Sequence, residues 1–476
     1  MSINCIRTLL EDAALTHSDK TSVVFGDKSV TYGELFSRVN QVAFYLEELG
    51  LPKDSRIGIY SNKGIEQVVS VLAILSTNHI LVPLTKLLKP EQVEYIINDC
   101  DIKCIITDKL KLESIEEINF DGHIISYETT SKDIASFDEI YKYYNKPYIC
   151  DINGHNNAVI TYSFGLSGTP KGIVISHRNL IDSARVVSQY LHLEENDIIS
   201  GLLIFNLDYG LNQIFCTLYK KARLALHRFI LPEDFFNHLI NDGVTVLPVM
   251  PVNLSQMFDE DVRRIPSADL FDSVKTITSS GGNVTEKMIG DCKKHFQKAS
   301  FYSMHGLTEA FRSTYLDPSQ VEIRPDSIGR PIPDVELYVI NADGNECAVR
   351  EVGELIHRGG YIYRGFWNAP EQNAERFKSV QILKDVINLE GQLTDEIVVA
   401  SGDYVYKDEE GYLYFVSRQD DMIKTRGFRV SPYEVESVVA INIPQIDQCA
   451  VFGIDNELIE QEIVMVYSAA GQISEN

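Results

Sequence analysis

Residues 161–172 read TYSFGLSGTPKG and directly follow the apolar run Ala158-Val159-Ile160. Glycine lets the backbone approach an anion closely, N–H groups and hydroxyls donate to phosphate oxygens, and lysine adds a positive charge. The spacing differs from the Walker pattern, because Pro170 precedes Lys171 and Gly172 follows it. The stretch predicts a phosphate-binding loop of another kind, and a flexible linker with a solvated lysine is the alternative interpretation.

The segment from Tyr162 to Gly172 resembles the phosphate-loop signature of the AMP-forming adenylating superfamily. This family comprises acyl-CoA synthetases, adenylation domains of peptide synthetases, and luciferases. Four further segments match family motifs in the family's order: Ser280-Gly281-Gly282, His305-Gly306-Leu307-Thr308-Glu309, Gly402-Asp403 with Asp408 and Gly411-Tyr412, and residues 418–424 leading into Gly427-Phe428-Arg429. Five ordered matches across most of the chain carry the resemblance.

The composition is that of a globular protein, with 44% hydrophobic and 23% charged residues in a chain of 476. This length suits one large multilayer domain and a smaller one. The formal net charge of −25 argues against nonspecific binding to nucleic acid or anionic membranes, which requires a basic patch. An anionic nucleotide must therefore be held by local donors and a divalent cation.

Cysteine usage and hydropathy indicate a cytoplasmic protein. The eight cysteines form no C-x-x-C pair and follow no secretory leader, so reduced thiols are expected. The most apolar segment, residues 68–84, is interrupted by Ser70, Ser76, Thr77, Asn78 and His79. It predicts a core helix and strand, and no membrane span is expected.

The order of predicted elements is typical of an α/β fold with doubly wound sheets. Thr31 and Glu34 form a capping-box pattern before apolar residues at helical spacing, which stop at Gly50. Residues 56–60 predict a strand and 65–75 a helix, and the alternation returns with a strand at 158–162, the loop, and a helix at 179–190. Short apolar strands are predicted at 222–226, 244–249 and 274–278.

The C-terminal third is predicted to consist mainly of short strands joined by tight turns. Short strands at 335–340, 353–357, 402–406 and 412–416, with hairpin-type turns, resemble the family's small β-barrel subdomain at about residues 328–417. The resemblance therefore implies a large domain over residues 1–419 and a partial α+β lid over 420–476. Asp420 falls at the family's hinge, and Gly427 at the path of the pantetheine thiol.

The resemblance implies a reaction in which a carboxylate attacks the α-phosphate of ATP, followed by transfer of the acyl group to a thiol. Positioning and charge neutralisation dominate such chemistry. The loop residues that match the β- and γ-phosphate cradle are Ser163, Gly165, Ser167, Gly168, Thr169 and Lys171. Thr308 would contact the α-phosphate, and Glu309 would ligate Mg²⁺; the alternative for Glu309 is a surface carboxylate.

Other matched positions would hold the nucleoside. Asp403 would accept hydrogen bonds from the ribose hydroxyls, with Arg418 helping from the opposite side. Gly281 and Gly282 would let adenine lie against the backbone, with Asn283 reading its edge, and Gly306, in the same motif as Thr308 and Glu309, would also belong to the nucleotide site. His305 stands where the family usually has a stacking tyrosine, and Phe164, Leu166 and Ser417 also depart from the family pattern, the first two removing loop donors.

The sequence defines the acid substrate less closely than it defines the nucleotide. Asp208 falls where amino-acid-activating members place an aspartate that pairs with the substrate ammonium, and Phe205 precedes it. An aspartate at a helix start can equally serve as a cap. The segment also resembles a bacterial acyl-CoA ligase group, so an amino acid and other small carboxylic acids both stay open.

Members of this family carry, near their C-terminus, a lysine that bridges the attacking carboxylate and the α-phosphate. In this sequence no lysine follows Lys424. Loss of such a donor costs about 100- to 1000-fold in rate, so this chain is expected to bind ATP and adenylate slowly.

The leading hypothesis is an AMP-forming ligase that uses ATP and Mg²⁺ to activate a small carboxylic acid. The acceptor would be the thiol of coenzyme A or of phosphopantetheine on an acyl carrier protein. The alternatives are a catalytically weak nucleotide-binding scaffold and a fatty acyl-CoA ligase.

Overall fold

The computed structural model describes residues 3–85, 88–118, 120–131, 134–143, 148, 151–164, 170–259, 265–389, 395–419, 421, 423–425, 428–443, 445–456 and 460–469. The chain divides into two compact units, which are described separately. Unit 1 comprises residues 1–325, 332–334 and 360–373. Unit 2 comprises residues 326–331, 335–359 and 374–476.

The first sheet of unit 1 has the strand order β7-β6-β5-β3-β4-β8-β9. All neighbours are parallel except β8 and β9, which form an antiparallel hairpin. Its strands are β3 (Arg56–Tyr60), β4 (Ile80–Leu84), β5 (Ile102–Thr107), β6 (His123–Ser126), β7 (Ala135–Ser136), β8 (Asn157–Phe164) and β9 (Pro170–Ser176). Parallel neighbours need crossover connections, and α3 (Ile65–Ile74), α4 (Pro90–Cys100) and α5 (Lys109–Glu116) lie in the connections from β3 to β4, β4 to β5 and β5 to β6.

The second group of strands in unit 1 has the order β15-β14-β13-β12-β10-β11-β1-β2. Its core, from β14 to β1, is parallel, and both ends are antiparallel. The strands are β1 (Thr21–Phe25), β2 (Lys28–Thr31), β10 (Ile198–Gly201), β11 (Arg223–Leu226), β12 (Val246–Val249), β13 (Thr276–Ser279), β14 (Ser300–His305) and β15 (Thr314–Leu316). The parallel strands end at a common edge, where ligand sites of open α/β sheets form.

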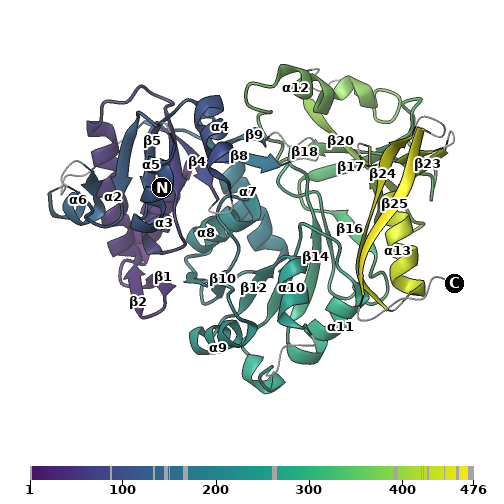
Figure 1. The fold of residues 1–476 in the computed structure, drawn as a ribbon, viewed down its shortest axis with the longest axis horizontal. Helices are drawn as coiled ribbons and strands as arrows, with labels where there is room; N and C mark the ends of the chain where they lie inside the picture. Colours follow the sequence, from purple (N-terminus) through teal and green to yellow (C-terminus); the bar gives the residue numbers. More distant parts are fainter. Residues whose placement is uncertain are drawn as a thin grey trace. The chain divides into compact units, whose positions relative to one another are not determined.

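Helices flank these strands (Figure 1). They are α1 (Ile6–Thr16), α2 (Tyr32–Glu48), α3 (Ile65–Ile74), α4 (Pro90–Cys100), α5 (Lys109–Glu116), α6 (Phe137–Tyr143), α7 (His177–Tyr190), α8 (Asp208–Lys220), α9 (Pro232–Asp242), α10 (Pro251–Met257) and α11 (Glu286–His295). A short helix, α12 (Pro370–Arg376), spans the boundary between the residues of the two units. The helix α2 begins at the predicted capping box: Thr31 Oγ1 accepts from the Glu34 N–H at 3.2 Å, and Glu34 accepts from the Thr31 N–H at 2.9 Å. No helix in the described ranges is both apolar and long enough to cross a bilayer.

Unit 2 contains an antiparallel sheet of order β17-β18-β20-β21-β16, with β19 pairing with β20. Its strands are β16 (Ser327–Pro331), β17 (Val335–Ile340), β18 (Gly353–Gly359), β19 (Phe377–Ser379), β20 (Ile397–Lys407) and β21 (Leu413–Arg418). A four-stranded sheet of order β23-β22-β25-β24 follows, and Figure 1 shows α13 (Pro432–Asn442) beside it. These strands are β22 (Ile423–Thr425), β23 (Phe428–Val430), β24 (Ile446–Asn456) and β25 (Glu460–Ala469).

The predicted α/β fold class is confirmed, and every strand and helix named from the sequence is present with small shifts at its ends. The predicted barrel region is an antiparallel sheet, and none of the pairings among its described strands closes it into a ring. The boundary expected at residue 420 stays a prediction.

Candidate active site

The predicted phosphate loop connects the two strands of the β8–β9 hairpin. Ser163 pairs with Lys171 across the hairpin, so the first predicted donor and the lysine lie opposite each other at the end that adjoins the loop. The strand β9 was not expected from the sequence, because Pro170 and Gly172 read as loop residues. The tip, with the predicted cradle residues Gly165, Ser167, Gly168 and Thr169, lies outside the described residues.

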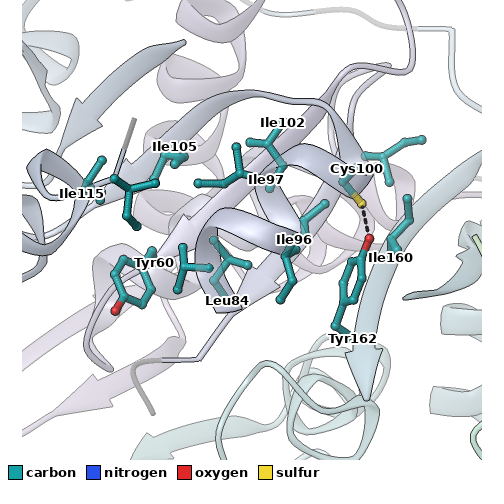
Figure 2. Close-up of a cluster of buried hydrophobic side chains, with 14 of the residues drawn as sticks. Tyr60, Leu84, Ile96, Ile97, Cys100, Ile102, Ile105, Ile115, Ile160 and Tyr162 are labelled. Atoms are coloured by element: carbon teal, nitrogen blue, oxygen red, sulfur yellow. Dashed lines mark hydrogen bonds between the residues drawn. The ribbon is translucent and has the colours of Figure 1, made fainter. Parts of the chain in front are cut away.

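A hydrophobic core anchors the first strand of this hairpin. Ile160 and Tyr162 pack with Ile96, Ile97 and other buried side chains of the first sheet (Figure 2). The Tyr162 hydroxyl lies 3.0 Å from the Cys100 Sγ and donates to the Asp99 carboxylate at the end of α4. Ser163 therefore follows a residue that is held at both its ring and its hydroxyl.

Gly172 has a packing role. A Cβ at this position would lie 2.9 Å from Ile160 Cγ2 and 3.0 Å from Tyr162 Cζ. Any side chain there would push apart the two strands behind the loop. This glycine is therefore required by the cross-strand contact with Tyr162.

The turn after β14 carries the predicted α-phosphate and metal residues. His305 ends β14, and the Leu307 N–H donates to the Ala310 carbonyl at 3.2 Å, so the backbone folds tightly over Thr308 and Glu309. A Cβ on Gly306 would lie 2.7 Å from the Phe311 carbonyl oxygen. Glu309 is only 8% exposed. A carboxylate oxygen is the ligand type that Mg²⁺ prefers, so Glu309 fits the predicted metal role.

A segment that the sequence did not single out joins these two parts of unit 1. Residues 360–367, called the linking segment below, lie along both β9 and the turn after β14. On one side the Trp367 N–H donates to the Gly172 carbonyl at 2.8 Å, and the Val174 N–H donates to the Gly365 carbonyl at 2.9 Å. On the other, the Tyr363 N–H donates to the Glu309 carbonyl at 2.9 Å. The linking segment thus fixes the β8–β9 hairpin relative to Glu309, and its glycines, Gly360 and Gly365, were its only sequence signal.

The predicted adenine segment follows β13. Gly281 has a φ of +85°, which favours glycine, and a Cβ there would lie 3.2 Å from Met250 Cε. A Cβ on Gly282 would likewise lie 3.3 Å from Pro251 Cγ. Because β13 and β14 are parallel neighbours, their carboxyl ends lie at the same edge of the sheet. Residues 281–283 follow β13 at that edge, and His305 ends β14 there.

Asp208 occupies the first turn of α8 and Phe205 is buried ahead of it. Asp208 Oδ1 accepts from the Tyr209 N–H at 2.6 Å, and Oδ2 accepts from the Tyr363 hydroxyl at 3.2 Å. Burial raises the pKa of the Asp208 carboxyl, and the charge of Arg312 and these two hydrogen bonds oppose that rise. The side chain is therefore held by the linking segment as well as by its own helix, which a simple helix cap would not require.

Lys63, another residue that the sequence reasoning missed, fixes the approach to α8. Its Nζ donates to three successive carbonyls, of Gly201 at 2.6 Å, Leu202 at 2.5 Å and Leu203 at 2.8 Å, and lies 5.1 Å from the Phe205 ring centre. These bonds satisfy the backbone at the carboxyl end of β10. The position of Phe205 is set by this ammonium.

The predicted ribose residues lie together in unit 2. Asp403 on β20 pairs in register with Arg418 on β21, and Arg418 Nε lies 3.2 Å from Asp403 Oδ1. Asp403 is buried, while the Arg418 side chain is exposed. Arg418 therefore contacts Asp403 directly. The predicted hinge residue Asp420 and the predicted tunnel residue Gly427 lie outside the described residues.

The fold is that of an α/β protein, and comparison with known proteins specifies the class. The family model described as "AMP-binding enzyme" matches residues 10–367, more than half of the chain. The chain therefore belongs to the AMP-binding enzyme family, as the five motifs indicated.

Curated relatives are peptide synthetases. Tyrocidine synthase 1 of Brevibacillus parabrevis is 24% identical over 440 residues, which cover 91% of this chain and 38% of that protein. Tyrocidine synthase 2 of the same organism is 27% identical over 90% of this chain and 11% of its own length. The chain thus spans far less than two thirds of these relatives.

Solved structures with the same fold include acid–CoA ligases. o-Succinylbenzoate coenzyme A synthetase (MenE) of Bacillus subtilis, in complex with ATP and magnesium ion, has a TM-score of 0.82 at 22% identity, covering 98% of this chain and 90% of its own. The anthranilate CoA ligase AuaEII, in complex with anthranoyl-AMP, has a TM-score of 0.84 at 23% identity, covering all of this chain and 89% of its own. At these identities the likeness shows the fold.

Proposed function

We propose that this protein activates a small carboxylic acid with ATP and passes the acyl group to a thiol of coenzyme A or a carrier protein. In the first step a carboxylate oxygen attacks the α-phosphorus, the bond to the β-phosphate oxygen breaks, and pyrophosphate leaves. An acyl-adenylate results. The thiol sulfur then attacks the acyl carbon, the thiol proton is released, and AMP leaves.

The observation that carries this proposal is the position of Tyr363. Its backbone N–H binds the Glu309 carbonyl, and its hydroxyl binds the Asp208 carboxylate. A single residue thus connects the predicted metal ligand with the predicted acid-binding aspartate. A ligase that activates an amino acid with ATP would use a metal-binding carboxylate and an ammonium-binding carboxylate in one site.

The phosphate roles follow from donor chemistry. Lys171 and Ser163 carry an ammonium and a hydroxyl at the loop end of the hairpin, and Thr308 carries a hydroxyl beside Glu309. Such groups stabilise charge on phosphate oxygens when they are fixed before reaction. Glu309 would hold Mg²⁺, which supplies charge neutralisation when bound. The ribose role of Asp403 and Arg418, and the adenine role of Gly281, Gly282, Asn283 and His305, rest on the family resemblance and stay predictions.

An exchange assay tests the proposal. The chain is incubated with Mg²⁺, ATP, labelled pyrophosphate and a panel of carboxylic acids, and label is expected in ATP only when an acid is present. Glu309→Gln should lower the exchange rate by about 100- to 1000-fold. The matched control, Glu286→Gln, alters an exposed residue of α11 and should leave the rate unchanged.

Two results would contradict the proposal. ATP binding without exchange for any acid would favour the nucleotide-binding scaffold, and exchange confined to long-chain fatty acids would favour the fatty acyl-CoA ligase. The slow adenylation expected from the sequence stays a prediction, and a single-turnover measurement of acyl-adenylate formation tests it.

A further inference from the structure

The last turn of α4 holds the β8–β9 hairpin from outside. Asp99 lies in that turn, and its carboxylate accepts from the hydroxyl of Tyr162 on β8. The main-chain carbonyl of Asp99 accepts from the indole N–H of Trp367 at 3.0 Å. The main-chain N–H of Trp367 in turn donates to the Gly172 carbonyl on β9 at 2.8 Å. One residue of α4 is therefore joined to both strands of the hairpin, to β8 directly and to β9 through Trp367.

These contacts form a closed cycle. Tyr162 and Gly172 are partners in the register of the hairpin, and a Cβ on Gly172 would lie 3.0 Å from Tyr162 Cζ. The tyrosine side chain therefore lies directly against the glycine on the facing strand. The cycle, called the hairpin clamp below, consists of Asp99, Tyr162, Gly172 and Trp367, which all belong to unit 1. Because its members come from four separate segments, the hairpin clamp fixes both strands relative to the rest of this unit.

The hairpin clamp adjoins the predicted phosphate donors. Ser163 follows Tyr162 along β8, Lys171 precedes Gly172 along β9, and these two donors are themselves partners in the register. A displacement of either clamped residue would therefore move the donor next to it. Catalysis of phosphoryl transfer depends mainly on the positioning of such groups.

The end of α4 is itself fixed, as holding the hairpin requires. The last four carbonyls of a helix have no partner within the helix. The Cys100 carbonyl accepts from Nε of Arg56, at the start of β3, and the Asp99 carbonyl accepts a second bond from Asn368 Nδ2 at 3.1 Å. The Arg56 guanidinium also lies 5.5 Å from the centre of the Trp367 ring system. A positive charge at this end of a helix is favourable, so Arg56 stabilises both α4 and its contact with Trp367.

The contacts also define where the protons lie. Tyr162 has one hydroxyl proton, which it donates to Asp99, so the Cys100 thiol, 3.0 Å away, donates to the Tyr162 oxygen (Figure 2). Burial and the neighbouring Cys100 and Asp99 raise the pKa of Tyr162, and burial raises the pKa of Cys100 to about 12. Both groups therefore stay protonated at physiological pH, and the bond to Asp99 is retained.

We propose that Asp99 is a positioning residue for ATP, because it holds both strands of the hairpin and thereby fixes Ser163 and Lys171 against the phosphates. This inference rests on the proposed function and adds to it a residue that acts through its neighbours. The candidate acid residue Asp208 is held separately, by the Tyr363 hydroxyl. Loss of the hairpin clamp should therefore weaken the binding of ATP and leave the binding of the acid unchanged.

A double-mutant cycle tests the proposal. Asp99→Ala, Tyr162→Phe and the double variant are compared with the wild type, with the Kd for ATP and Mg²⁺ measured by calorimetry and the KM for the acid by pyrophosphate exchange. Each single variant loses a hydrogen bond to a charged group and should raise the Kd for ATP roughly 10-fold. The double variant should bind ATP no more weakly than the single variants, because both substitutions remove the same interaction. The KM for the acid should stay as in the wild type.

A conservative variant and two controls accompany the cycle. Asp99→Asn keeps an acceptor oxygen for the Tyr162 hydroxyl and should restore most of the affinity for ATP. Glu94→Ala and Tyr95→Phe make similar changes at exposed positions of the same helix and should leave the Kd unchanged. Urea unfolding of each variant shows whether it is folded under the conditions of the assay.

Trp367 supplies a second readout, because it is the only tryptophan of the chain. Addition of ATP and Mg²⁺ to the wild type should change the tryptophan emission, since the hairpin clamp joins the indole to the strands that carry Ser163 and Lys171. In Asp99→Ala the midpoint of this titration should rise as the calorimetric Kd does. An unchanged emission of the wild type, when calorimetry shows that ATP is bound, would overturn the proposal.

This inference and the proposed function fail differently. Folded Asp99→Ala and Tyr162→Phe variants that bind ATP with the wild-type Kd overturn the positioning role and leave the ligase intact. Additive effects in the double variant, or equal increases in the Kd for ATP and the KM for the acid, overturn it as well, because they indicate a general loss of packing. ATP binding by the wild type without exchange overturns the ligase, and the series of Kd values then still decides the role of Asp99.

Discussion

The hydroxyl of Tyr363 donates to Asp208 Oδ2 at 3.2 Å, across 155 positions of the sequence. Burial and the negative charge of Asp208 raise the pKa of Tyr363 well above its usual value, so this hydroxyl stays a donor at physiological pH. The bond stabilises the ionised form of Asp208, which is the form that binds an ammonium.

Tyr363→Phe is therefore expected to weaken binding of the amino-acid substrate. Loss of one hydrogen bond to a charged group should raise the KM about 10-fold. Because Tyr363 holds the pKa of Asp208 down, the acidic limb of the kcat/KM profile should also move to higher pH. A pH series of pyrophosphate exchange checks both effects.

Tyr338→Phe is the matched control, since its hydroxyl donates to Glu336 at 2.8 Å in unit 2. That variant should leave the KM and the pH profile as they are. An unchanged profile for Tyr363→Phe would show that the bond to Asp208 has no role in substrate binding.

Gly306→Ala should disrupt the turn that carries Thr308 and Glu309. The new Cβ would lie 2.7 Å from the Phe311 carbonyl oxygen and 3.5 Å from the Arg312 Cα, so the backbone must move. A displacement of catalytic groups by about 1 Å costs about 100-fold in rate. We expect a loss of this order in kcat/KM, measured by exchange.

The control for this substitution is Gly290→Ala within α11, where no atom lies within 4 Å of the added Cβ. Alanine is a better helix former than glycine by up to about 1 kcal/mol. Urea unfolding should show equal or greater stability, with activity retained. Equal activity of both variants would refute the role given to the turn.

Stability should fall on mild acidification because of His177. This residue is buried, burial lowers its pKa to about 4, and its Nδ1 accepts from the Ile6 N–H at 3.4 Å. Since the unfolded state titrates near pH 6.5, it binds more protons than the folded state between about pH 4 and 6.5, and stability decreases as pH falls through that range. The contribution of His177 amounts to about 2 kcal/mol between pH 7.5 and pH 5.

His177→Gln should make the free energy of unfolding less dependent on pH over this interval, as measured by urea titration at pH 7.5 and 5. Burial also lowers the pKa of His79 and His227, so part of the dependence should persist. An identical pH dependence in wild type and variant would contradict the assignment.

Local signals explain why much of the fold could be predicted. The capping box at Thr31 and Glu34 fixes the start of α2 through contacts within four residues. The strand β9 was missed because its pairing with β8 outweighs the loop-forming tendency of Pro170 and Gly172.

The candidate site was predictable only where motifs carried it. Lys171, Glu309 and Asp208 were named as candidates from their sequence neighbours. Tyr363 was not, because its hydrogen bond joins it to Asp208 in a segment far away along the chain.

The most direct test of the central claim follows the oxygen that attacks ATP. An acid that supports exchange is prepared with ¹⁸O in its carboxylate and incubated with the chain, Mg²⁺, ATP and a thiol acceptor, and the AMP is analysed by mass spectrometry. Attack on the α-phosphorus predicts one ¹⁸O atom in AMP. Unlabelled AMP, or label in ADP or inorganic phosphate, would contradict the account.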